Sequence, residues 1–115
     1  PSFAVMDAAN KLGIKYTAYN RVVCTRDGYA YDTVPTHPTS DQRVDKIAAI
    51  REFSYREDVK LSETAFVTCN PDDRNVFNFV GLSIAFNSTD ANLKKAASIV
   101  VNSKSLADVL EYIIK

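Results

Sequence analysis

The sequence has no tryptophan, three glycines, two cysteines and no excess of charge of either sign. Cys24 and Cys69 lie far apart and form no Cys-x-x-Cys pair, so the sequence predicts reduced thiols rather than a zinc site or a disulfide framework. Fourteen basic residues balance fourteen acidic ones, so no net field draws the chain to nucleic acid or to an anionic membrane surface. We therefore expect neither of these partners.

Long apolar runs are also lacking. The longest are a few residues, too short to span a bilayer, and the first residues show no basic stretch followed by an apolar one. These absences favour a soluble cytoplasmic protein. What is present is a chain of 115 residues, 46% hydrophobic and 24% charged, which is the composition of one modest globular domain over residues 1–115.

The first half of the chain mixes helical and strand-like patterns. The predicted order is a helix ending at Gly13, a strand over 15–25, a turn over 26–28 and a second strand over 29–34. Thr39 and Gln42 then have the spacing of a capping box, which predicts a second helix running to about Tyr55.

The second half alternates strands and helices regularly. The predicted order is a strand over 65–69, a helix from Asn70 and Pro71 to Gly81, a strand over 82–86, a helix over 90–97, a strand over 99–101 and a final helix. Ser105 and Asp108 form a capping box for that last helix, whose apolar stripe consists of Leu106, Val109, Leu110 and Ile113. This order predicts an α/β fold with a partial Rossmann-like parallel sheet and a separate β-hairpin. Any site should lie at the carboxyl ends of the strands, over 69–73.

Several stretches of the chain resemble one family. They are Gly81–Asn87, Leu93–Lys94, Ala96–Ala97, Ile99–Val101 and Leu106–Leu110, with Ala8–Ile14 and Asn20–Val23 upstream. Together they resemble the carboxyl-terminal half of haloacid-dehalogenase-type (HAD-like) phosphatases related to phosphoserine phosphatase. The resemblance implies a partial HAD-like domain.

The resemblance also implies a site. Lys46 sits where the family's third-motif lysine is expected, as a phosphate contact. The family's fourth motif reads roughly Val-Gly-Asp-Gly-x-Asn-Asp, and the aligned residues here are Val67–Asp73, which places Cys69 at the first acidic position and Asp73 at the second. In the family that first carboxylate helps to hold Mg²⁺, which requires hard oxygen ligands, so a thiol leaves a weak metal site at Asp72 and Asp73.

Each of these residues also has a plainer interpretation. Asp72 and Asp73 fall in the first turn of a predicted helix, where carboxylates favour the positive end of the dipole. Cys69, at the end of an apolar strand, is expected to be a small buried side chain, with a reactive thiol as the alternative. Lys46 could be an ordinary solvated lysine. His37, between two prolines, is expected to be an exposed loop residue without a role.

The family's Asp-x-Asp motif is absent, since no two aspartates are separated by one residue. Without it no covalent phosphoaspartate can form. One hypothesis is a phosphatase-related domain that is inactive alone and serves binding or assembly. The other is part of an active Mg²⁺-dependent hydrolase of a phosphorylated small molecule, such as phosphoserine or phosphoglycolate, whose nucleophile lies outside this chain. Because the resembled fold has central strands that this chain lacks, the strand over 65–69 needs a cover. We expect a homo-oligomer or a missing amino-terminal half to provide it, with the hairpin from Tyr16 to Val34 refolded against this strand as the alternative.

Overall fold

The computed structural model describes residues 2–114, including all their side chains except those of Ser2, Phe3 and Tyr31. The chain divides into two compact units, which we call unit 1 (Pro1–Phe53) and unit 2 (Ser54–Lys115). The expectation of a single domain over residues 1–115 stays a prediction. Within the described residues, no helix has the length and apolar character needed to cross a membrane.

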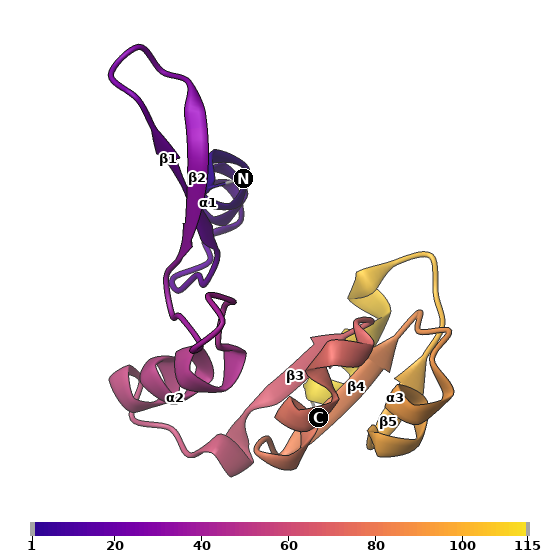
Figure 1. Ribbon diagram of the computed structural model, residues 1–115. Coiled ribbons are helices and arrows are strands. Elements are labelled where there is room, and N and C mark those ends of the chain that lie inside the picture. The colour runs from indigo at the N-terminus through magenta and orange to yellow at the C-terminus, as the bar shows by residue number, and fades with distance from the viewer. Residues whose placement is uncertain (1, 115) are drawn as a thin grey trace. The chain divides into compact units, whose positions relative to one another are not determined.

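Unit 1 opens with the helix α1 (Ser2–Leu12), beside an antiparallel hairpin of β1 (Asn20–Cys24) and β2 (Ala30–Pro35) (Figure 1). The helix ends where the sequence predicts, because Gly13 adopts a φ of 69° that favours glycine. The hairpin is confirmed, but its first strand is shorter than predicted.

Residues 15–19, predicted as the start of the first strand, lie outside the hairpin because Tyr16 packs against α2 (Lys46–Arg56). The ring of Tyr16 stacks on that of Phe53, with centroids 5.0 Å apart. A stacked aromatic pair adds about 1 kcal/mol to the burial of its two rings. Residues 15–19 therefore connect α1 to the hairpin as irregular chain.

The helix α2 (Lys46–Arg56) begins later than predicted, because its cap is Asp45 and not Thr39. The Asp45 carboxylate accepts a hydrogen bond from the backbone N–H of Ala48 at 3.0 Å, which is the geometry of an N-cap. The capping box predicted for Thr39 and Gln42 is therefore wrong.

Thr39 closes a turn instead. Its hydroxyl oxygen accepts a hydrogen bond from the backbone N–H of Arg43 at 3.0 Å, and its O–H donates to the Asp41 carboxylate. That hydrogen bond lowers the pKa of the Asp41 carboxyl below its ordinary value. A threonine side chain bonds to nearby backbone in turns as well as at helix starts. The spacing of Thr39 and Gln42 alone therefore could not show where α2 begins.

His37 is not the exposed loop residue that the sequence predicts. Its side chain is only 18% exposed and its Nε2 lies 2.5 Å from Oε2 of Glu52 on α2. Its Nδ1 lies 3.1 Å from the Thr36 hydroxyl, and its ring meets that of Phe53 edge to face. His37 thus fastens the loop after β2 to α2. The proline-rich context suggested a loop correctly, but it carried no information about what packs on that loop.

We expect Glu52→Ala to destabilise unit 1 by about 1–2 kcal/mol, because it removes a partly buried hydrogen-bond partner of His37. Alanine is a better helix former than glutamate, so a loss cannot come from helix propensity. The measurement is urea denaturation of Glu52→Ala, His37→Ala and the double variant. A coupling energy near zero in this cycle would contradict the proposed fastening.

Unit 2 contains a parallel three-stranded sheet in the order β3 (Ala65–Thr68), β4 (Leu82–Phe86) and β5 (Ile99–Val101). The 3₁₀ helix η2 (Pro71–Asn78) connects β3 to β4, and α3 (Ala91–Ala96) connects β4 to β5. The predicted parallel sheet with alternating strands and helices is confirmed.

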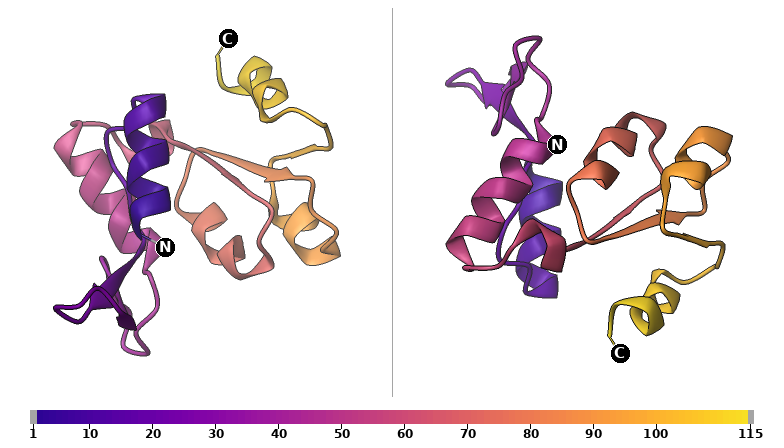
Figure 2. Two further views of the ribbon diagram at one scale, coloured as in Figure 1. Left: turned by 90° about the horizontal axis from the view of Figure 1, so that it is seen from above. Right: turned by 90° about the horizontal axis from the view of Figure 1, so that it is seen from below.

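The sheet of unit 2 separates two apolar clusters. The cluster on one face consists of Phe77, Ala85 and Leu93, with Phe66 and Ala97 packed against them. The cluster on the other face is built on Ile84, Val101 and Val109. Figure 2 shows the corresponding helices on opposite sides of the strands. Because neighbouring residues of β4 enter different clusters, both Ile84 and Ala85 are fully buried, which explains why this strand is apolar except at Ser83.

Gly81 does not stop the helix before it, as the sequence suggested, because η2 already ends at Asn78. Gly81 allows a close approach of two backbone segments. Its N–H lies 3.1 Å from the carbonyl oxygens of both Leu61 and Thr64, at the ends of the short 3₁₀ helix η1 (Leu61–Glu63). A Cβ at this position would lie 1.8 Å from the carbonyl oxygen of Ser62.

The end of the chain forms a 3₁₀ helix, η3 (Leu106–Val109), followed by a short α4 (Leu110–Ile113). Ser105 caps it as predicted, accepting a hydrogen bond from the N–H of Ala107. The reciprocal half of the capping box is absent, since the N–H of Ser105 donates to the hydroxyl oxygen of Ser103, whose O–H in turn donates to the Asp108 carboxylate. Of the predicted apolar stripe only Val109 is buried; the exposed members are Leu106, Leu110 and Ile113.

Candidate functional site

The candidate site is the connection between β3 and η2, at the carboxyl end of an edge strand of the sheet. Asn70 caps η2, because its side-chain oxygen accepts a hydrogen bond from the N–H of Asp72 at 3.0 Å. Pro71 follows at the first helical position, where its missing N–H costs nothing. This start of η2 agrees with the sequence prediction.

Thr68, the last residue of β3, organises the connection. Its hydroxyl oxygen accepts a hydrogen bond from the N–H of Asn70 at 3.0 Å, and its O–H donates to Oδ2 of Asp73 at 2.6 Å. Sequence analysis missed this residue. A threonine at the end of an apolar strand, five residues before an aspartate, is the signal that was available for it.

The two aspartates differ in environment. Asp73 is 5% exposed, and the Thr68 hydroxyl is a hydrogen-bond donor to its carboxylate. A buried carboxylate needs such donors, because burial without them is costly. Asp72 is exposed to solvent. Through its hydrogen bond with Thr68, Asp73 links the first turn of η2 to the end of β3.

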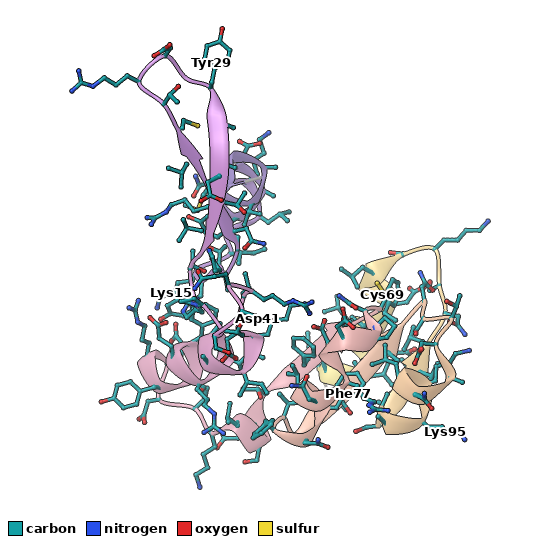
Figure 3. All side chains as sticks on the ribbon, in the orientation of Figure 1. Lys15, Tyr29, Asp41, Cys69, Phe77 and Lys95 are labelled. Carbon is teal, nitrogen blue, oxygen red and sulfur yellow. The ribbon has the colours of Figure 1, made fainter. Side chains whose placement is uncertain are left out.

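Cys69 is exposed, so the prediction of a small buried side chain is wrong. The reason is that β3 ends at Thr68, one residue earlier than predicted, which leaves Cys69 in the connection rather than inside the sheet. Its position at the start of this connection is marked in Figure 3. The side chain is a free thiol.

Lys46 is the first residue of α2 and is exposed. It belongs to unit 1, whereas Asp72 and Asp73 belong to unit 2. The structure thus brings Thr68, Asn70 and Asp73 together in one hydrogen-bonded connection. The assignment of Lys46 as a phosphate contact stays a prediction.

No protein-family model and no curated protein matches the chain. Solved structures do match. A crystal structure of phosphoserine phosphatase in the apo form is 26% identical with a TM-score of 0.82, covering 96% of this chain and 54% of that one. A substrate-bound phosphoserine phosphatase is also 26% identical, with a TM-score of 0.81 and coverage of 96% and 51%. A haloacid dehalogenase-like hydrolase from Bacteroides thetaiotaomicron, 18% identical with a TM-score of 0.57, shares the fold over 95% of this chain and 38% of its own.

The fold of this chain is HAD-like. The resemblance to HAD-like phosphatases that the sequence predicted is thereby confirmed. The chain spans about half the length of the phosphoserine phosphatase chains that it matches, at 51–54%.

The HAD-like resemblance implies Mg²⁺, and the residues of the connection can be tested against that ion. Among residues 2–114, no three side chains of the His, Cys, Asp and Glu types are grouped so that they could hold a metal. Asp73 is already a hydrogen-bond acceptor from Thr68, and the neighbouring Cys69 offers a soft thiol where Mg²⁺ requires oxygen. The described residues therefore do not fit a magnesium site by themselves.

Proposed function

We propose that this chain is a HAD-like phosphatase-related domain that does not hydrolyse phosphate esters by itself and serves binding or assembly. The observation that supports this most directly is the hydrogen bond from Thr68 to Asp73, next to the exposed thiol of Cys69. The resemblance implies Asp73 as a metal ligand, but its carboxylate accepts the Thr68 hydrogen bond in the first turn of η2. At the position of the other implied carboxylate the chain has the thiol of Cys69. A nucleophile in the form of Asp-x-Asp is absent from the sequence.

We expect the isolated chain to hydrolyse p-nitrophenyl phosphate in the presence of Mg²⁺ no faster than a blank without protein. Loss of both nucleophile and metal removes the covalent step and the charge stabilisation on which such enzymes depend. The assay is the release of p-nitrophenolate, with Lys46→Ala as a control. Turnover above the blank that disappears in Lys46→Ala would overturn the proposal.

A second function is favoured by the comparison with phosphoserine phosphatase, at 26% identity over half of its length. In this case the chain is one part of a Mg²⁺-dependent phosphate-monoester hydrolase, with phosphoserine or phosphoglycolate as the substrate class. Lys46 would hold phosphate and Asp73 would help to hold Mg²⁺, while the nucleophile comes from a segment outside this chain. The test is to mix the chain with a separate polypeptide that carries the Asp-x-Asp segment of phosphoserine phosphatase. Phosphoserine hydrolysis by the mixture, absent from each part and lost in Asp73→Asn, would favour this second function.

We expect Cys69→Asp to raise the affinity for Mg²⁺ by at least about tenfold, or ~1.4 kcal/mol, because it places a hard anionic ligand four residues before Asp73. Isothermal titration calorimetry measures the effect. Cys69→Asn is the matched control, since it has nearly the same shape as aspartate without the charge. If Cys69→Asp and Cys69→Asn bind Mg²⁺ equally weakly, the connection acts only as a helix start.

A further inference from the structure

An open polar cavity of about 480 Å³ lies on the surface between η2 and α3 in unit 2, and all the residues that line it are exposed. It is lined by Arg74, Asn75, Asn78, Asn92, Lys95 and Ala96. The lining therefore holds two cations, three amides and one methyl group, and no carboxylate. Figure 3 shows Lys95 well away from Cys69, whereas Arg74, at the other side of the lining, directly follows Asp73 in η2.

The two cations of the cavity have no counter-ion among the described residues. Among residues 2–114, neither Arg74 nor Lys95 forms an ion pair with a carboxylate. The whole chain has no net charge, so this positive patch is a local feature. Arg74 comes from η2 and Lys95 from α3, which pack together through Phe77 and Leu93. An anion placed between the two cations would be attracted by both.

The three asparagines extend the polar lining around these cations. Asn75 and Asn78 are three residues apart on a 3₁₀ helix, where such side chains lie on the same side. Asn92 and Lys95 have the same spacing on α3 and also share one side of their helix. Within the described residues, none of the three amide side chains is hydrogen-bonded to another residue. Each amide can both donate and accept, which suits hydroxyl groups.

We propose that this cavity binds a small phosphorylated polyol, with the phosphate between Arg74 and Lys95 and the hydroxyl groups at the asparagines. The lack of aromatic residues in the lining argues against a ligand with a flat apolar ring. Binding leaves the ligand intact, so this inference does not depend on phosphatase activity.

The experiment is a nuclear magnetic resonance titration of the full ¹⁵N-labelled chain with glucose 6-phosphate, inorganic phosphate, glucose and succinate. We expect glucose 6-phosphate to bind more tightly than inorganic phosphate, with shifts at Arg74, Asn92 and Lys95. Glucose alone should cause no such shifts. Arg74→Gln and Lys95→Gln should each weaken binding about tenfold, whereas Lys104→Gln, an equal charge change at an exposed site outside the lining, should not.

A second pair of variants separates charge from folding. Asn92→Asp puts a carboxylate into the lining at the first turn of α3, where negative charge is favourable, so the fold should persist while binding is lost. Asn102→Asp makes the same charge change at an exposed residue after β5 and should bind normally. The proposal is overturned if the folded chain binds no glucose 6-phosphate at millimolar concentration. It is equally overturned if succinate binds more tightly, or if the lining variants and their controls behave alike.

Discussion

Gly81→Ala should destabilise unit 2 by about 3 kcal/mol or more, which is a large share of the stability of a small domain. The added Cβ would lie 1.8 Å from the carbonyl oxygen of Ser62 and 2.6 Å from its carbonyl carbon. Both are backbone atoms, so no side-chain rotation can relieve the clash. Separating the two segments would break the hydrogen bonds from the Gly81 N–H to Leu61 and Thr64 and would displace the start of β4.

The measurement is urea denaturation, with the amide signals of Ile84 and Ala85 reporting on the core of unit 2. Gly28→Ala in unit 1, followed by the amide signal of the buried Ala49, is a suitable control, because Gly28 has a φ of 89° but open space around it, so only a conformational cost of about 1 kcal/mol is expected. Adding Ser62→Ala to Gly81→Ala should give no rescue, since the clash involves backbone. A loss below about 1 kcal/mol in Gly81→Ala would contradict the close approach.

The strands of unit 2 could be predicted from the sequence because buried strands appear in it as short runs of mainly apolar residues. The bounds of β4 and β5 match the predicted strands, since both faces of β4 need apolar side chains. Helix starts were predicted where the side-chain bond is local, as at Asn70 and Ser105. Thr39 misled because the same local bonding closes a turn.

The candidate site was less predictable, because its geometry depends on where chain segments meet. The position of Asp73 came from the family resemblance, but its bond to Thr68 depends on how sharply the chain turns after β3. Cys69 is exposed and not buried as predicted, because β3 ends one residue before the predicted end of this strand. The His37 side chain is only 18% exposed because it contacts Glu52 and Phe53, fifteen and sixteen residues later, and no local pattern indicates these contacts.

β3 lies at the edge of the sheet of unit 2, and its unpaired outer side predicts that the chain forms a dimer. In the described part of the chain, β3 has β4 as its one hydrogen-bonded neighbour, and β1 and β2 form a sheet of their own. Parallel sheets of α/β proteins are normally covered, and an edge with free N–H and C=O groups invites pairing. The phosphoserine phosphatase chains that match are about twice as long as the region they share, at 51–54% coverage. We propose that a second copy of the chain pairs with β3 through an isologous interface.

Sedimentation velocity should therefore show a species of about twice the chain mass of 12.8 kDa that dissociates on dilution. Ala65→Lys, at the exposed first residue of β3, should weaken association at least about tenfold, because lysine on an edge strand opposes pairing. Asn102→Lys adds the same charge at an exposed residue outside β3 and should associate like the unchanged chain. A stable monomer at every concentration would contradict the dimer. The chain would then be stable in water with the outer edge of β3 unpaired.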